Sequence, residues 1–388
     1  MSRDDRLPRR RLLHVLGVGG VATALPPAIR TALADVPQRL DGAYARLAVE
    51  VRAAGLHFPW SAVQLPDGAL LVSEKHPGRL RRVGADGTVS APLKGVPEVF
   101  AEGNAGLLGL ALDPDFARNR TFYVAFAEPG EGGTAALAVA RAELAADRID
   151  DLQILFRQRP KVADIRDFGG RIAIGPDGHL YVATGDLFAR DLVQRTDNTI
   201  GVVARVTTDG AVPADNPFVG REGHDPTIWS LGHRNPGAAA FHPETGRLWL
   251  AEFGPFGGDE LNIVEPGRNY GWPRVSWGRH YTGEAIPAPP TRPDLAPSLY
   301  HWNPVIGPSG MAFYDAEAIP AWRGSLLIGG LTSQSLIRLT LRGERVIAEE
   351  RLPLGVRIRD VLVARDGAVL LLTDEPEGRI LRLAPVPD

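Results

Sequence analysis

Six variants of one strand–turn–strand unit recur along the chain, and they constrain its fold more than any other feature. Each unit has a short alternating run rich in Val, Ile and Leu, then a turn, then a second run that ends near a polar residue. The units span 59–74, 106–126, 169–186, 235–252, 308–330 and 358–374. Asp-Gly pairs in three of the turns supply the positive φ that tight hairpins need. The repeats predict an all-β, six-bladed β-propeller with long inter-blade loops, such as 187–227 and 264–307.

The stretches between the units contain little helical sequence, which argues against the main structural alternative. A parallel α/β fold needs a helical crossover between successive strands, and only 137–151 has helical composition. The chain has 388 residues, 44% of them hydrophobic, which is enough for one large all-β domain. A propeller gathers its loops around a central channel, so we expect the functional residues there.

The first 34 residues have the pattern of an export signal. Three arginines at 9–11 precede a weakly apolar run to Leu25, and an A-x-A cleavage site lies at 32–34. We therefore predict a twin-arginine signal peptide at 1–34, a mature propeller at 35–388, and a periplasmic or secreted protein. The apolar run is too short and too rich in Gly to span a bilayer. A disordered basic tail is the alternative.

Composition excludes several classes of function. The chain has no Cys, so disulfides, thiolate metal sites and cysteine nucleophiles are excluded. Its net charge is −3 and no basic block is dense enough to predict nucleic-acid binding. The nine His are scattered, and no G-x-S-x-G, H-E-x-x-H or Walker pattern is present.

Polar motifs at the starts and ends of the units contain the candidate binding and catalytic residues. Arg357 and Arg359 are two residues apart on a predicted strand and so share a face. With Arg234 they could clamp a multiply anionic small molecule, since guanidinium pairs with carboxylate bidentately; outer-face salt bridges are the alternative. Asp259 and Glu260 follow a Gly-Pro turn and offer the hard oxygen ligands that suit Ca²⁺; an acidic surface loop is the alternative.

These motifs, in their order, resemble a known enzyme family. The stretches that carry the resemblance are GLLGLALDPDF, FGGRIAIGPDGHLYVATGD, VPADNPF, IWSLGHRNP, GGDELNIVEPGRNYGWP, GPSGMAFY and IRDVLVARDG. Together they are similar to the soluble aldose sugar dehydrogenases of the glucose/sorbosone dehydrogenase family, which use pyrroloquinoline quinone (PQQ). The resemblance implies a six-bladed propeller, PQQ and Ca²⁺ as cofactors, a sugar or related alcohol as substrate, and an external electron acceptor. It leaves the oligomeric state open.

The resemblance also implies roles for individual residues. Arg234 and Asn235, in the GHRNP run, correspond to residues that contact PQQ, and Arg234 also to an electrophilic activator. Arg357 and Arg359 match two arginines that hold cofactor or substrate, and Tyr281 matches a tyrosine that lines the pocket.

Two Ca²⁺ sites follow from the same resemblance. The carbonyls of Gly254 and Pro255 match those that bind the Ca²⁺ next to PQQ. Glu260 and Tyr270 have the ten-residue spacing of a second Ca²⁺ site in the family.

Four positions depart from the family pattern. Asp167 stands where the family has its catalytic histidine, Asn104 where a glutamine is usual, Thr332 where some members have a lysine, and Phe253 where a histidine is common. An aspartate of ordinary pKa, near ~4, is a weaker base at pH 7 than histidine unless burial raises that pKa. The neighbouring charge of a tricarboxylate cofactor would also raise it.

Three functions therefore stay open at this point. The first is a PQQ-dependent dehydrogenase with Asp167 as base. The second is a catalytically impaired propeller that binds a ligand or partner. The third is a Ca²⁺-dependent lactone hydrolase, in which Asn104, Asp167 and Asn235 could converge as ligands.

Overall fold

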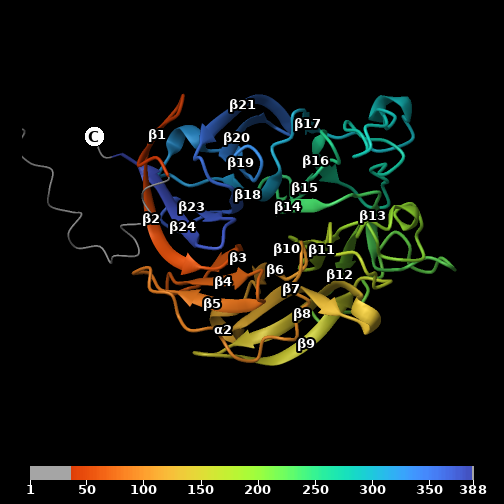
Figure 1. Cartoon of the computed structure of the whole chain (residues 1–388), viewed down its shortest axis with the longest axis horizontal. Helices are drawn as coiled ribbons and strands as arrows, with labels where there is room; N and C mark the ends of the chain where they lie inside the picture. The colour runs from red at the N-terminus through yellow and green to blue at the C-terminus, as the bar shows by residue number, and fades with distance from the viewer. Residues whose placement is uncertain (1–35, 387–388) are drawn as a thin grey trace, which may run out of the picture.

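Six antiparallel sheets surround a common centre in the computed structural model, in which residues 36–386 are described (Figure 1). Each sheet is one blade, and the predicted six-bladed propeller is confirmed. The predicted signal peptide lies outside the described residues.

The blades follow the chain in order. Blade 1 contains β3 (Pro59–Gln64), β4 (Leu70–Glu74) and β5 (Arg79–Val83). Blade 2 contains β6 (Leu107–Leu112), β7 (Thr121–Pro129), β8 (Ala135–Leu144) and β9 (Ile149–Arg157), with the short helix α2 (Phe116–Asn119) between β6 and β7. Blade 3 contains β10 (Gly169–Ile174), β11 (Leu180–Thr184), β12 (Val202–Val206) and β13 (Ile228–Leu231).

The second half of the ring repeats the arrangement. Blade 4 contains β14 (Pro236–Phe241), β15 (Leu248–Glu252), β16 (Asp259–Val264) and β17 (Tyr300–Trp302). Blade 5 contains β18 (Pro308–Tyr314), β19 (Ser325–Gly330), β20 (Ser335–Arg342) and β21 (Arg345–Pro353). Blade 6 contains β22 (Ile358–Val363), β23 (Val369–Thr373), β24 (Gly378–Pro385), β2 (Arg46–Leu56) and β1 (Arg39–Asp41). Four 3₁₀ turns lie in loops, at Glu131–Gly133, Arg190–Leu192, Pro289–Thr291 and Pro320–Trp322.

The six sequence repeats form the two innermost strands of each blade. The first strands, β3, β6, β10, β14, β18 and β22, contact one another in a closed ring. Each of them shifts register against its partner near its first residues, as between Gly169 and Arg171 or between Ile358 and Asp360. Such a bulge bends the strand and re-aims its side chains. The same end of every blade therefore presents irregular backbone to the centre.

Blade 6 closes the ring by joining the two ends of the chain. The N-terminal strand β2 pairs with β24, with Val49 opposite Leu383. This pairing holds the first and last blades together and was not predicted from the sequence.

The segment 137–151 forms parts of two strands and the turn between them, and not a helix, in spite of its composition. It belongs to β8 and the start of β9. Successive β8 side chains face two different cores: Leu137 and Val139 pack in one, while Ala138 and Ala140 pack in another. Burial on both faces of a blade outweighs the helical preference of Ala, because propensity is a weak prior against tertiary packing.

A buried ion pair joins four blades at the centre. Arg171 Nη1 lies 2.7 Å from Asp360 Oδ1, and the guanidinium of Arg171 also donates to the carbonyls of Gly237 and Arg359. Asp360 Oδ2 accepts from Ala62 N. Blades 3, 4, 6 and 1 are thus tied together around the axis.

Candidate functional site

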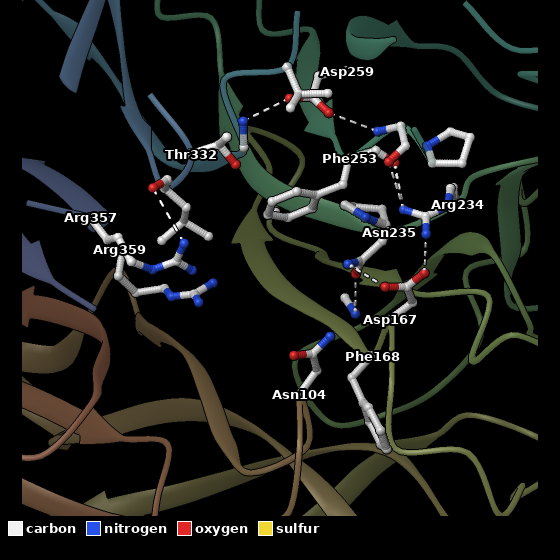
Figure 2. Close-up of a pocket in the computed structure, with 18 of the residues that line it drawn as sticks. Asn104, Asp167, Phe168, Arg234, Asn235, Phe253, Asp259, Thr332, Arg357 and Arg359 are labelled. Atoms are coloured by element: carbon white, nitrogen blue, oxygen red, sulfur yellow. Dashed lines mark hydrogen bonds and ion pairs between the residues drawn. The ribbon is translucent and has the colours of Figure 1, made fainter. Parts of the chain in front are cut away.

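A cavity of about 300 Å³ lies at the bulged ends of the innermost strands (Figure 2). Most of the predicted site residues line it: Asn104, Asp167, Arg234, Asn235, Gly254, Pro255, Tyr281, Thr332, Arg357 and Arg359. Figure 2 shows Arg357 and Arg359 on one side of the cavity and Asp167 on the opposite side. The propeller therefore brings together residues that are up to 255 positions apart, from Asn104 to Arg359.

Asp167 is buried at the corner where blades 3 and 4 meet. Its Oδ2 lies 2.8 Å from Arg234 Nη2, and its Oδ1 accepts a hydrogen bond from Asn235 Nδ2 at 3.1 Å. The Asn235 side chain is fixed in turn, because its Oδ1 accepts from Gly169 N. Asp167 has φ +50°, in the left-handed region that Asp tolerates better than most residues. The loop before β10 thus turns the carboxylate toward the start of β14.

The pKa of Asp167 is raised above the usual value for a carboxyl. Burial is the main cause, and the charges of Arg234 and Arg166 oppose it. Neither Arg166 nor Arg171 ties the carboxylate up, since Arg166 pairs with Asp164 and Arg171 pairs with Asp360. A buried carboxylate with a raised pKa is a better proton acceptor than an exposed one.

Arg234 links Asp167 to the Gly-Pro turn. Its Nη1 donates to the carbonyls of Phe253 and Gly254, both at 3.1 Å, and its Nη2 donates to Tyr281 Oη at 3.2 Å. The carbonyl of Pro255 accepts no hydrogen bond within residues 36–386. One carbonyl of the predicted Ca²⁺ pair is therefore entirely available, and the other is shared with a guanidinium.

Asp259 fixes this turn through both of its carboxylate oxygens. Its Oδ1 accepts from Gly254 N, and its Oδ2 accepts from Ile306 N and Gly307 N at 2.9 and 2.7 Å. Burial raises the pKa of Asp259 to about 6, and these N–H groups partly offset the rise. We call Asp167, Arg234 and Asp259 the acidic wall of the pocket.

The opposite wall carries mostly positive charge. Asp374 bridges the two predicted arginines: Arg357 donates to its Oδ2 and Arg359 to its Oδ1, at 2.9 and 3.0 Å between the closest atoms. Burial would raise the pKa of Asp374, but Arg359, Lys75 and Arg357 outweigh it and lower the pKa to about 2. Lys75 also lines the cavity and lies near these residues, since its charge acts on Arg359, Arg357 and Asp374. We call these four residues the cationic wall.

Lys75, Asp374 and the buried Asp186 were not predicted as site residues. Asp186 N donates to Arg234 O, and Trp272 Nε1 donates to Asp186 Oδ2 at 2.7 Å. Each of the three lies at, or one residue beyond, the end of a repeated unit. Because the second strand of each unit ends at the bulged face, the polar residues that end the units were the available signal.

The four departures from the family pattern all line this one cavity. The side chains of Asn104 and Thr332 form no hydrogen bond with any described residue, so both are free for a ligand. Phe253 points into the cavity between the two walls (Figure 2). Gly237 makes room for it, since a Cβ there would lie 2.5 Å from the Phe253 ring.

Glu260 and Tyr270 lie apart from the main cavity, around an adjoining space of about 20 Å³ that Glu252 also lines. Burial, and next the charge of Glu252, raise the pKa of Glu260. The Tyr270 hydroxyl donates to Ile263 O and accepts from Glu265 N, so only its carbonyl remains as a possible ligand. Across residues 36–386, no three or more His, Cys, Asp or Glu side chains gather as a metal cluster.

Within the described part of the chain, no helix has both the length and the apolar character needed to cross a membrane.

Comparisons with known proteins agree with the fold and the motifs. The sequence model of the family described as Glucose / Sorbosone dehydrogenase matches residues 56–382. The chain is 38% identical to the aldose sugar dehydrogenase YliI of Escherichia coli (strain K12), over 89% of this chain and 95% of that protein. A crystal structure of a glucose dehydrogenase is similar at a TM-score of 0.84 and 46% identity, over 87% of this chain and 100% of that one. The PQQ-bound aldose sugar dehydrogenase of Streptomyces coelicolor has a TM-score of 0.71 and 31% identity, over 88% and 98%.

Proposed function

Because the chain belongs to the glucose/sorbosone dehydrogenase family, we propose that it is a PQQ- and Ca²⁺-dependent dehydrogenase that oxidises an aldose or a related alcohol at a hydroxyl carbon. The observation that carries the proposal is that the acidic wall and the cationic wall face each other across one cavity. The buried Asp167, with its raised pKa, faces a wall of three cations, two of which pair with the one carboxylate there. Such a cavity suits an anionic cofactor on one side and proton abstraction on the other.

The residues present fit a planar tricarboxylate such as PQQ. Four basic side chains line the cavity: Lys75, Arg234, Arg357 and Arg359. Among the described residues, the Asn104 amide, the Thr332 hydroxyl and the Pro255 carbonyl have no hydrogen-bond partner there. Unpaired polar groups at a partly buried site favour a ligand that completes them. When bound, PQQ supplies the hydride acceptor.

Asp167 accepts the hydroxyl proton of the substrate in this proposal. Asn235 holds one carboxylate oxygen and Arg234 lies beside the other, so the group is oriented before the substrate arrives. Each oxygen retains a lone pair for the incoming proton. The guanidinium of Arg234 also supplies positive charge where negative charge grows during the reaction.

The Ca²⁺ part of the proposal rests on the turn at Gly254 and Pro255. Their carbonyls are hard oxygen donors at the edge of the cavity, and Asp259 holds the turn through Gly254 N. For the second site, Glu260 is the carboxylate ligand and Tyr270 contributes its carbonyl. A cation there would relieve the cost of burying Glu260 next to Glu252.

We further propose that residues 1–34 direct the folded protein through the twin-arginine pathway to the periplasm or the medium. An electron acceptor outside the cytoplasm then reoxidises the cofactor. Replacing the three arginines at 9–11 by lysine should retain the unprocessed chain in the cytoplasm, which fractionation and immunoblotting detect.

The central test combines PQQ titration with turnover of Asp167→Asn. The purified protein is titrated with PQQ in the presence of Ca²⁺ and assayed on a panel of sugars with a dye as electron acceptor. We expect Asp167→Asn to bind PQQ yet lose about 10²–10⁴-fold in kcat, the usual contribution of general base catalysis. Asp147→Asn, an exposed carboxylate paired with Lys94, is the matched control and should keep full activity.

Other outcomes point to the other two functions. A wild-type protein that binds no PQQ would end the dehydrogenase proposal. Wild-type inactivity together with activity in Asp167→His would indicate a catalytically impaired propeller. Hydrolysis of lactones without PQQ would indicate the Ca²⁺-dependent hydrolase.

A further inference from the structure

Lys75 is a nearly buried ammonium group without a polar partner. It follows β4 directly, lines the main cavity and is only 9% exposed. Its Nζ forms no hydrogen bond and no ion pair with any described residue; its nearest specific contact is the ring of Phe58, 5.6 Å to the centroid. An ammonium group has three protons to donate, and those of Lys75 open onto the cavity. An anion bound in the cavity would give this group the partner that the described residues do not supply.

The neighbouring carboxylate cannot fill that role. Both oxygens of Asp374 are taken by guanidinium groups, one by Arg357 and one by Arg359. Burial first, and then the charges of Arg359 and Arg357, lower the pKa of Lys75 to about 8 against the opposing charge of Asp374. The cationic wall thus carries two more positive charges than negative ones when Lys75 is protonated.

The backbone fixes where the lysine side chain begins. Lys75 N donates to Phe58 O, and Lys75 O accepts from Leu107 N. Gly106 leaves space for the stem, since a Cβ there would lie 2.5 Å from Lys75 Cγ and 2.3 Å from Lys75 O. The side chain is therefore anchored between blades 1 and 2, a placement that favours pre-organised binding.

We propose that Lys75 binds a carboxylate of the quinone cofactor beside Arg359, and so replaces, from blade 1, the lysine that other family members carry where this chain has Thr332. The inference rests on the proposed function. It assigns the third cation of the cationic wall to the cofactor and not to the sugar. A lysine suits this place because its compact charge reaches into a space that the two arginines, held by Asp374, leave open.

The first test measures PQQ affinity without sugar, by absorbance or fluorescence titration. Lys75→Met should weaken PQQ binding by about 10- to 150-fold, as expected for losing a hydrogen-bonded charge, whereas Lys75→Arg should retain most of the affinity. Lys94→Met is the matched control, because Lys94 is exposed and pairs with Asp147 on the surface. The double variant Lys75→Met/Thr332→Lys should recover PQQ affinity, because a lysine on blade 5 restores the positive charge that Lys75→Met removes from blade 1.

The second test is the pH profile of PQQ binding to the wild type. Binding needs the protonated lysine, so affinity should fall as pH rises through about 8 and above. The charged groups that act on Lys75 are Arg357, Arg359 and Asp374, with His76 next to it in the chain. The pKa of Asp374 is about 2, and burial lowers the pKa of His76 from its ordinary value, so neither group changes its charge near pH 8. This profile needs no variant and so does not depend on how Lys75→Met folds.

The outcomes separate this inference from the proposed function. Failure of the wild type to bind PQQ ends both. Normal wild-type binding with an unchanged dissociation constant in Lys75→Met, or with a flat profile between pH 7 and 9, overturns the lysine inference alone. A variant that keeps PQQ affinity but raises KM for the sugar places Lys75 at the substrate, which also overturns it.

Discussion

The two walls of the pocket bury acidic groups in similar ways and perturb them in opposite directions. On the acidic wall, burial raises the pKa of both Asp167 and Asp259, and the opposing charges, of Arg234 on both residues and also of Arg166 on Asp167, do not outweigh it. On the cationic wall, three cations surround Asp374 and lower its pKa to about 2. Desolvation is the first cause for all three residues, so the direction of each pKa shift depends on whether the neighbouring charges and hydrogen bonds outweigh it. The first arrangement suits proton transfer, and the second suits holding an anion.

The largest effect is expected where the acidic wall loses the guanidinium that pairs with Asp167. Arg234→Ala leaves the buried Asp167 without its ion-pair partner, so the free energy of unfolding at pH 7 should fall by about 3–5 kcal/mol. Arg357→Ala on the cationic wall should cost less than about 1 kcal/mol, because the Arg357 side chain is 46% exposed and Arg359 still pairs with Asp374. Denaturant unfolding of both variants measures the contrast.

A companion variant shows whether the lost charge is the cause. Arg234→Ala/Asp167→Asn removes both partners and should recover part of the stability lost in Arg234→Ala. Equal losses for Arg234→Ala and Arg357→Ala would mean that the two walls do not differ as described.

The contribution of the cationic wall to the free energy of unfolding should fall in acid. The folded pKa of Asp374 is about 2, below the unfolded value near ~4, so its contribution is complete above pH ~4 and is lost as pH falls toward 2. The contribution should not exceed about 3 kcal/mol, from roughly two pKa units. Unfolding free energies of the wild type and Asp374→Asn, compared at pH 5 and pH 2.5, give the difference, which should narrow at the lower pH.

Asp186, which lies behind the acidic wall, should change the stability with pH in the opposite direction to Asp374. Burial, and next the charge of Asp167, raise the pKa of Asp186 to about 6. The folded state therefore binds the proton more tightly than the unfolded chain, and this group adds stability as pH falls from 6 toward 4. Asp186→Asn should remove that gain, again up to about 3 kcal/mol. A wild-type stability that instead falls between pH 6 and 4, with Asp186→Asn showing the same slope, contradicts the sign.

The sequence predicted the blades well because their signal is local. Alternating strands and Asp-Gly turns are contained within each unit, and the six units became the two inner strands of six blades. The pairing of β2 with β24 joins residues more than 300 positions apart and left no local signal. The composition of 137–151 wrongly indicated a helix, because a blade that is buried on both faces accepts Ala as readily as a helix does.

The sequence predicted which residues would line the site, but not how their charges would pair. Motifs identified Arg357, Arg359 and Arg234, but that Asp374 pairs with two of them, and that Lys75 of blade 1 lies near the same group without a pair, is visible only in the folded ring. Asp167, the proposed base, was predicted from a substitution in the family pattern, whereas its raised pKa follows from burial in the assembled ring, against the opposing charge of Arg234.

The smallest predicted effect concerns the edge of the acidic wall. Tyr281 is 60% exposed, and its hydroxyl accepts from Arg234 Nη2 at 3.2 Å. Tyr281→Phe removes one hydrogen bond whose donor can turn to water, so kcat/KM should fall by about 2- to 10-fold, equivalent to roughly 0.5–1.5 kcal/mol. Steady-state assays at saturating PQQ measure it, with Tyr44→Phe, an exposed tyrosine outside the pocket, as the control. A loss as large as that of Asp167→Asn would mean that the tyrosine hydroxyl, and not the carboxylate opposite the cationic wall, handles the proton.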